Sequence, residues 1–458
     1  DLGLHILEHH ARTHDPLAEF LTGNHRLVGL ALRRGRLAEE EGAARVAPGV
    51  AAADGEAVVS LLDGYGRLLD AVRPEKDGTF VLEPKENLTG TFVVEARVSA
   101  NGVIQDRQRK SLAAPRAPQT DPCLPFAIGE SAQRTGIRRY LVPLRHACYR
   151  AGGVNEIRFW HTESNDYFLD VADGGFATDF PVAGTHLWTF TRDFAEPYAK
   201  TGDRKYLCRK PCFDDPEWRA KDERRIRACI RTLQRNAPAS FDVGDENSLT
   251  LWGILFDFCF CDHTLTAFRN WLRREYGSLE ALNAEWRTTF GKWDDVTPIT
   301  TSEARAQHKG DRAYAAWADH RRYMELTYCG YFAAVKRIVS EEAPGVRLDM
   351  SGTQQPNGYT GMDMWLLSDT IDIAAAYDDN NLAEIVRSFG RPLIKPWYGY
   401  GATGPDVGRR AWFDAFRFKN CGVSFYDGMN FLDPDYTLPK SVTDLQATLK
   451  DLRRGGGL

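Results

Sequence analysis

The chain has 458 residues, of which 43% are hydrophobic and 26% are charged, as in an ordinary globular protein. Lys and Arg number 58 against 63 Asp and Glu, and a formal net charge of −5 predicts no general attraction to nucleic acid or to an anionic membrane. No apolar run approaches the roughly 18 residues of a membrane helix. The nine cysteines are scattered, which does not indicate a disulfide framework. At roughly 150 residues per domain, we expect two or three domains.

Residues 1–118 carry the pattern of a small β-sandwich after a short amphipathic lead-in. Short, partly alternating segments are separated by turn pairs such as Asp63-Gly64 and Asn101-Gly102. The predicted strands are Arg26–Leu32, Ala57–Leu62, Gly78–Leu82, Thr91–Val98 and Val103–Arg107. The Pro-rich stretch Ala113–Pro122 predicts a linker. The segment contains no Trp, which argues against an aromatic sugar-binding surface within it.

Residues 119–458 alternate between predicted strands and helices, which is typical of an α/β protein. The predicted strands are Pro125–Gly129, Val154–Trp160, His186–Phe190, Ser240–Glu246, Val346–Gly352, Ile371–Asp378, Leu393–Gly399 and Val423–Tyr426. The clearest helices are Tyr140–Gly152, Pro216–Asn236, Leu265–Gly277, Tyr314–Glu342 and Arg409–Asn420. Eight such repeats predict a (β/α)8 TIM barrel. An open doubly wound sheet is the alternative, and the absence of a Gly-rich loop after the first strand disfavours it.

In a barrel of this kind, chemistry takes place at the carboxyl ends of the strands. The predicted ends are rich in carboxylates, amides and aromatic rings, a combination that binds sugar hydroxyls and stacks on sugar rings. The candidate substrate-binding residues are Arg158, Trp160, His161, Glu163, Trp188, Asp245, Asn247, Asp379, Trp397, Tyr398 and Asp427. For several of the aromatic residues and histidines, a place in the core is an equally open interpretation.

The segment that follows the predicted fourth strand carries a specific series of motifs. Gly244-Asp245-Glu246-Asn247 is followed by Cys259-Phe260-Cys261-Asp262-His263, then by Ala267-Phe268-Arg269-Asn270-Trp271-Leu272 and by Tyr276-Gly277-Ser278-Leu279. Trp286 and Trp293-Asp294 come next, and Cys212-Phe213-Asp214-Asp215-Pro216 stands upstream. This series closely resembles the β-galactosidases of glycoside hydrolase family 42. The resemblance is dense over residues 205–296 and weaker elsewhere in the second half of the chain.

The resemblance implies a glycosidase whose catalytic domain is the barrel and whose general acid/base is Glu246. A carboxylic acid that protonates the leaving oxygen is what glycosidic cleavage requires. Without the resemblance, Glu246 is equally a strand-end glutamate in an ion pair. Most of the clan has Asn, which binds the sugar 2-hydroxyl, where this chain has Asp245.

The second catalytic carboxylate is missing at the position where the resemblance places it. Either the alignment slips there, or the nucleophile comes from another strand, or the usual double displacement is absent. Family members carry a nucleophilic Glu at the end of the seventh strand, whereas this strand holds no carboxylate and has Trp397 near that position. Asp378, Asp379, Asp427 and Glu163 are the candidate substitutes. We favour Asp378 because it ends an apolar predicted strand, although the run from Asp378 to Asn381 also fits a helix cap and turn. A carboxyl separation of about 5–5.5 Å would indicate retention and about 6.5–9.5 Å inversion.

The resemblance also suggests a structural zinc site, because family members often hold zinc with four cysteines. Cys212, Cys259 and Cys261 match this set, but Thr264 stands at the fourth position. His263 or Cys208 is the candidate fourth ligand, and buried free thiols are the alternative. Otherwise we expect no cofactor.

Several wider expectations follow. The expected partner is an oligo- or polysaccharide substrate, without nucleic acid or membrane, and a homo-oligomer is left open. A periplasmic or secreted location is favoured over a cytoplasmic one. A barrel that binds carbohydrate without cleaving it is the alternative to a hydrolase. A lyase or metal-dependent isomerase is disfavoured, because no carboxylate–histidine cluster has metal-ligand spacing.

Overall fold

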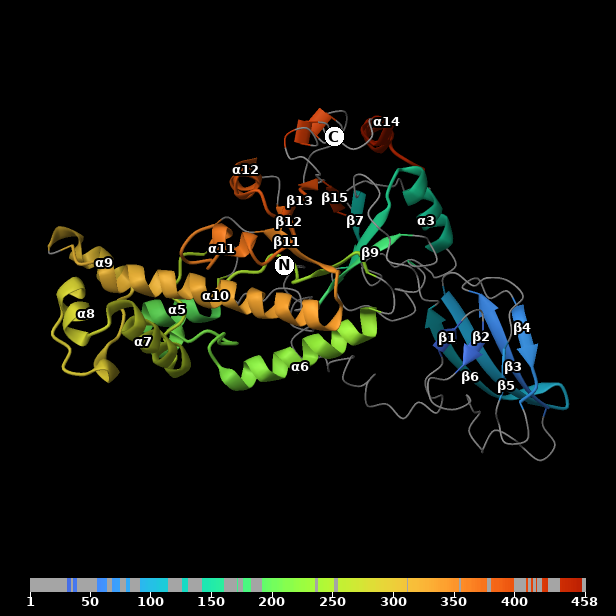
Figure 1. The fold of residues 1–458 in the computed structure, drawn as a ribbon, viewed down its shortest axis with the longest axis horizontal. Helices are drawn as coiled ribbons and strands as arrows, with labels where there is room; N and C mark the ends of the chain where they lie inside the picture. The colour runs from blue at the N-terminus through green and yellow to red at the C-terminus, as the bar shows by residue number, and fades with distance from the viewer. Residues whose placement is uncertain are drawn as a thin grey trace. The chain divides into compact units, whose positions relative to one another are not determined.

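The fold is described by a computed structural model (Figure 1). The chain divides into two compact units, Asp1–Ala114 and Pro115–Leu458. The residues that the structure describes are 31–33, 36–38, 56–63, 68–74, 80–82, 91–113, 126–130, 142–159, 171, 176–182, 192–234, 238–250, 254–310, 312–353, 356–376, 380–398, 409–410, 413–414, 417, 422–426 and 437–454.

The first unit contains an antiparallel sheet of four strands in the order β4-β3-β5-β6. The bounds are β3 Glu56–Asp63, β4 Leu68–Val72, β5 Thr91–Ala100 and β6 Val103–Ala113, and a separate hairpin joins β1 Ala31–Arg33 to β2 Arg36–Ala38. Val94, Ala96 and Val98 are buried and share one face of β5, because every second side chain of a strand points to the same face. Positive φ angles at Asn101 (52°) and Gly102 (74°) form the predicted tight turn between β5 and β6.

The predicted strands at 57–62, 91–98 and 103–107 are thus confirmed, whereas the described residues 80–82 lie outside any strand. The described part of this unit contains one four-stranded antiparallel sheet with buried residues and the separate two-stranded hairpin. The second layer of a sandwich is not established there and stays a prediction.

The second unit is built around a parallel sheet whose strands follow chain order. The bounds are β7 Phe126–Glu130, β8 Glu156–Phe159, β9 Ala177–Pro181, β10 Ser240–Asp242, β11 Arg347–Thr353, β12 Ile373–Ala376, β13 Leu393–Ile394, β14 Trp397–Tyr398 and β15 Val423–Tyr426. Strands β13 and β14 are two parts of one stretch of the chain, the seventh strand of the barrel. The first pairs with β12, the second pairs with β15, and β15 pairs with β7. These pairings close the sheet into the predicted eight-stranded barrel.

The prediction for the third strand is wrong. Ala177–Pro181 pairs with β8 on one side and with β10 on the other, so it takes the place assigned to His186–Phe190. Residues 186–190, with Trp188 among them, lie outside the described residues. The strand was missed because Ala-Thr-Asp-Phe-Pro is short, carries a charge and ends in proline, none of which is typical of an apolar strand.

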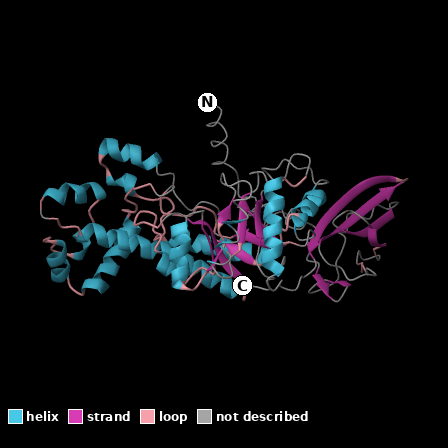
Figure 2. Ribbon diagram, turned by 90° about the horizontal axis from the view of Figure 1, so that it is seen from above, coloured by secondary structure: helices cyan, strands magenta, loops and turns pink. Residues whose placement is uncertain are grey.

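The same unit contains helices beside the barrel strands and a further group of helices that extends away from them (Figure 2). They are α3 Val142–Ala151, α5 Arg192–Thr201, α6 Pro216–Leu233, α7 Asp262–Tyr276, α8 Leu279–Trp286, α9 Thr301–Ala306, α10 Ala315–Glu342, α11 Met364–Ser368, α12 Asn380–Phe389 and α14 Lys440–Arg454. Asp215 begins α6 by accepting from the backbone N–H groups of Glu217 and Trp218, with Pro216 as the first helical residue. No helix of the described chain has the length and apolarity needed to cross a membrane.

The motif-rich segment after β10 forms α7 and α8, which pack on α10. Phe268 packs against Trp271, Trp286 and Tyr323, with ring centroids 5.2–6.2 Å apart. Asp319 of α10 accepts hydrogen bonds from Tyr276 (2.6 Å) and from the Trp286 indole (2.7 Å). Most of the aromatic residues that carry the family resemblance therefore build this small core.

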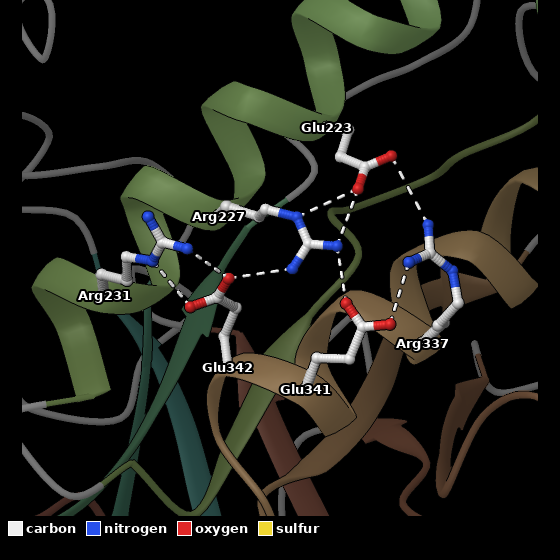
Figure 3. Close-up of polar contacts among 6 residues, drawn as sticks. All are labelled: Glu223, Arg227, Arg231, Arg337, Glu341 and Glu342. Atoms are coloured by element: carbon white, nitrogen blue, oxygen red, sulfur yellow. Dashed lines mark hydrogen bonds and ion pairs between the residues drawn. The ribbon is translucent and has the colours of Figure 1, made fainter.

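An ion-pair network joins α6 to α10, which lie side by side (Figures 1 and 3). Arg227 is its centre. It contacts Glu223 (2.7 Å) on its own helix and Glu341 (2.6 Å) and Glu342 (2.8 Å) at the end of α10. Arg231 also pairs with Glu342 (2.7 Å), and Arg337 with Glu341 (2.9 Å). Such networks stabilise more than isolated surface pairs do.

Candidate active site

The turn after β10 presents Glu246 at the carboxyl end of the fourth strand. Asp242, the last residue of β10, accepts from the Gly244 N–H at 2.8 Å and from the Ser351 N–H at 3.2 Å. Gly244 has φ 106° and Glu246 has φ 49°. The left-handed conformation is costly for a residue with a side chain, and such strain clusters at functional sites. Asp245 and Glu246 are both partly exposed.

Buried hydrogen bonds hold this turn from behind. The Asn247 side-chain amide donates to the Val243 carbonyl (2.8 Å), and the Tyr328 hydroxyl donates to the Asn247 carbonyl (2.7 Å). The Leu249 N–H donates to Thr360 O (2.8 Å), and Arg209 donates to Leu249 O (3.1 Å). Asn247 is 0% exposed, so its position favours holding the turn over the predicted contact with a sugar.

The barrel interior below the turn contains a cluster of charged side chains, which we call the interior cluster: Glu156, Arg158, Asp179, Asp242, Asp349 and Lys395. All six are buried. The Arg158 guanidinium lies 2.7 Å from Asp179 and 3.7 Å from Asp242, and it also pairs with Asp349. Lys395 pairs with Glu156 and lies 3.5 Å from Asp349. Arg158 was predicted to contact substrate, but it is 0% exposed and is engaged by carboxylates.

The seventh strand carries two of the predicted aromatic site residues, Trp397 and Tyr398. Trp397 is 0% exposed, and its ring lies 5.1 Å from the Arg158 guanidinium carbon. Tyr398 is also buried and donates a hydrogen bond to Asp414. Both residues are therefore packed within the barrel and its helix layer, and neither presents the exposed ring face that a stacking subsite needs.

The remaining predicted site residues lie outside the described residues. They are Trp160, His161, Glu163, Trp188, Asp378, Asp379 and Asp427. Glu246, Asp245, Asn247, Arg158, Trp397 and Tyr398 are the predicted site residues that the structure places.

The predicted metal ligands converge, but only three of them. The sulfurs of Cys212, Cys259 and Cys261 lie within 4.8 Å of one another. Thr264 takes the fourth side: its hydroxyl lies 3.2 Å from the Cys212 sulfur and donates to Asp214 at 2.9 Å. His263 is exposed, and this group of close ligand atoms contains neither His263 nor Cys208, so a fourth ligand from either residue stays a prediction. The described residues around the three thiols therefore do not fit a closed four-ligand zinc site.

The interior cluster was missed by the sequence analysis, although a signal was present. In Phe241-Asp242 and Leu348-Asp349-Met350, a charged residue alternates with buried apolar ones. In a barrel strand, alternate side chains point to the interior and to the helix layer. An Asp flanked by apolar residues in a short strand therefore indicates an interior carboxylate.

Comparison with known proteins supports the family resemblance over part of the chain. Residues 209–383 match the model of the Glyco_hydro_42 family, described as β-galactosidase, and the resemblance is confirmed for that segment. A β-galactosidase BgaA of Thermus sp. is 33% identical over 174 residues, which are 36% of this chain and 24% of that protein. BgaA of Planococcus sp. (strain 'SOS Orange') is 36% identical over 88 residues, which are 17% and 13%. The matches thus span a quarter or less of these relatives' length.

Solved structures agree with the barrel fold. A cold-adapted β-galactosidase from Rahnella sp. R3 superposes with a TM-score of 0.55 at 12% identity, over 74% of this chain and 58% of that one. The catalytic domain of a β-amylase from Paenibacillus polymyxa gives a TM-score of 0.52 at 13% identity, over 72% and 98%. At this identity the likeness concerns the fold alone.

Proposed function

Since residues 209–383 match the model of the family-42 β-galactosidases, we propose that the barrel is a glycoside hydrolase with Glu246 as its general acid/base. Its substrate is a β-linked, galactose-containing oligo- or polysaccharide. The observation that carries the proposal is the Glu246 turn. Glu246 is a partly exposed residue with a left-handed backbone conformation at the carboxyl end of the fourth barrel strand, and buried hydrogen bonds of Asn247 hold the turn beside it.

The second carboxylate of the proposed reaction is Asp378, which follows β12. Strand β12 lies between β11 and β13, two places around the barrel from β10. Trp397 stands near the position that the resemblance assigns to the nucleophile on the seventh strand, so the proposal takes the partner of Glu246 from the end of the adjacent sixth strand. If the two carboxyls stand about 6.5–9.5 Å apart, Asp378 activates a water and the reaction inverts the anomeric centre.

The alternative function is carbohydrate binding without cleavage. Trp397 favours it, because its buried ring packs on Arg158 where a nucleophile would otherwise stand. A cofactor is not part of either proposal, since two carboxylates suffice for glycosidic cleavage. The three thiols beside Thr264 are proposed to be a structural remnant of the family's metal site.

Glu246→Gln tests the acid role. We expect kcat/KM to fall by about 10²–10⁴-fold on a β-galactoside with an alkyl leaving group. The loss on the nitrophenyl β-galactoside is expected to be smaller, because a good leaving group needs little protonation. Asp245→Asn, which introduces the residue found in most of the clan, is the matched control and should retain turnover on both substrates.

Two outcomes would contradict the proposal. Equal losses for the two leaving groups would mean that Glu246 does not act as an acid. Binding of galactosides by the unchanged protein, measured by calorimetry and without turnover, would favour the binding-only alternative.

Asp378→Asn should abolish turnover of both substrates, and a variant with normal activity would remove Asp378 from the mechanism.

A further inference from the structure

The interior cluster contains more acids than cations. Among the described residues, Arg158 and Lys395 are the two cations that contact it, and Glu156, Asp179, Asp242 and Asp349 are the four carboxyls. The six side chains come from β8, β9, β10, β11 and the linker between β13 and β14, and all are buried. Isolated charge is very costly in such an interior, so these six described side chains balance electrically when two of the four carboxyls hold a proton.

The environment of two aspartates agrees with this count. Burial raises the pKa of Asp242 to about 7 and that of Asp349 to about 8, against the opposing attraction of Arg158. Asp179 repels both, and Asp245 adds to the repulsion at Asp242. Lys395 favours the ionised form of Asp349. These are the charged groups that face the pair from β8, β9, the 244–246 turn and the seventh strand.

Asp242 connects this cluster to the catalytic turn. Its Oδ1 accepts from the N–H groups of Gly244 and Ser351, while its Oδ2 faces the Arg158 guanidinium at 3.7 Å. Glu246 lies two residues beyond Gly244 and has a backbone conformation that depends on its surroundings. When Asp242 ionises, its negative charge repels that of Asp245 on the same turn.

We propose that Asp242 is a positioning residue for Glu246 and that the interior cluster carries protons at neutral pH. One carboxyl oxygen of Asp242 holds the Gly244 turn. The other oxygen shares the Arg158 guanidinium with Asp179 and Asp349. The positioning role rests on the proposed function of Glu246. The proton-holding role does not, because it concerns only the barrel interior.

The direction of the pH effect follows from the raised pKa values. A carboxyl that keeps its proton more firmly when folded contributes stability that is fully present below its unfolded pKa of about 4 and is lost as the pH rises through its folded pKa. The window for Asp242 and Asp349 therefore runs from about pH 4 to about pH 8. Above it, the barrel is less stable and the turn is pushed away from its resting position.

Asp242→Asn is the informative variant, because Asn resembles protonated Asp and keeps an oxygen for the Gly244 N–H. Asp222→Asn is the matched control: Asp222 is also a buried aspartate, paired with Arg225 (2.7 Å) and with the Tyr331 hydroxyl (2.7 Å), but it lies on α6 outside the barrel interior. The Tm of the full chain is measured between pH 5 and pH 9. We expect the unchanged protein to lose several degrees over this range, Asp242→Asn to lose roughly half as much, and Asp222→Asn to keep the original slope.

The pH profile of nitrophenyl β-galactoside hydrolysis tests the positioning role. Asp242→Asn is expected to move the alkaline limb of kcat/KM up by roughly one pH unit, and Asp242→Ala, which loses the oxygen, to lower kcat/KM by at least about tenfold at every pH. A limb that moves to lower pH, as the loss of a nearby negative charge alone would cause, overturns the positioning role. An unchanged Tm slope in Asp242→Asn overturns the proton-holding role. If the unchanged protein cleaves no galactoside, the proposed function and the positioning role fail together, while the Tm slopes still decide the cluster.

Discussion

Gly361 lies behind the Glu246 turn and, of the glycines in the described part of the chain, has the least room for a side chain. It has φ 79°, and a Cβ built on it would lie 2.8 Å from Leu249 Cδ1 and 2.9 Å from Tyr328 Cβ. Leu249 follows the turn, and Tyr328 holds it through the Asn247 carbonyl. Gly361→Ala is therefore expected to destabilise the barrel and to disturb Glu246 as well.

The expected loss of unfolding free energy has a backbone part and a packing part, and substitutions at other glycines allow the two to be measured separately. A left-handed conformation costs an alanine about 1–2 kcal/mol, and forcing atoms into a packed core costs about 1–3 kcal/mol more. Allowing for the reduced freedom of the unfolded chain, about 0.4–1 kcal/mol, the net loss for Gly361→Ala is about 2–4 kcal/mol. Gly345 has φ 86° but nothing within 4 Å of its Cβ position, so Gly345→Ala isolates the backbone part, about 1 kcal/mol.

Urea unfolding of the three proteins measures these differences at constant m-value. Gly330→Ala completes the set: Gly330 lies within α10 with open space around it, and alanine there should stabilise by about 0.5–1 kcal/mol. Equal losses at Gly361 and Gly345 would refute the packing argument. A large loss at Gly361 with unchanged kcat/KM would refute the coupling of this wall to Glu246.

Three further predictions concern other parts of the barrel unit. Asp215→Ala removes the side chain that caps α6 and should lower the unfolding free energy by about 1 kcal/mol, measured in urea, whereas Asp215→Asn should lose little because Asn also caps. Thr264→Cys places a fourth thiol beside the three cysteines, so we expect this variant to bind one zinc ion per chain, measured by mass spectrometry of the metal content. Its Tm should rise when zinc is added. A variant that takes up no more zinc than the original protein would contradict the geometry. Arg227→Met removes the centre of the network between α6 and α10, and its loss of stability should shrink as salt is raised from about 0.05 to 1 M; a loss independent of salt would indicate packing alone.

The barrel could be predicted because its pattern is distributed along the chain. Strands at 126–130, 347–353 and 423–426 lie close to their predicted positions, and α6 and α10 begin within a residue of theirs. The third strand could not be found, because a strand buried on both faces is recognised by an apolar run, and Asp179 interrupts it. In the seventh strand, Lys395-Pro396 separates two short pairings that the sequence suggests as one strand.

The sequence predicts the position of a candidate site residue only where that residue belongs to a recognisable motif. The position of Glu246 at the end of the fourth strand follows from the Gly244–Asn247 motif. That Asn247 supports the turn, and that Arg158 points into a carboxylate cluster, depends on contacts between residues far apart in the chain. Asp349 is brought to Arg158 by the closed ring of strands, and a local pattern does not contain that information.

The way the ring closes also constrains how the protein can be made. The last strand, β15, pairs with the first, β7, so the joint links residues about three hundred positions apart, among the slowest contacts for a chain to form. During synthesis at about 5–20 residues per second, β7 waits for its neighbour for at least about 15 seconds after its own emergence. Through that interval one edge of β7 is an unpaired strand edge, open to strands of other chains. Slow translation or crowded polysomes should therefore reduce the yield of soluble protein, and chaperones that shield strand edges should restore it.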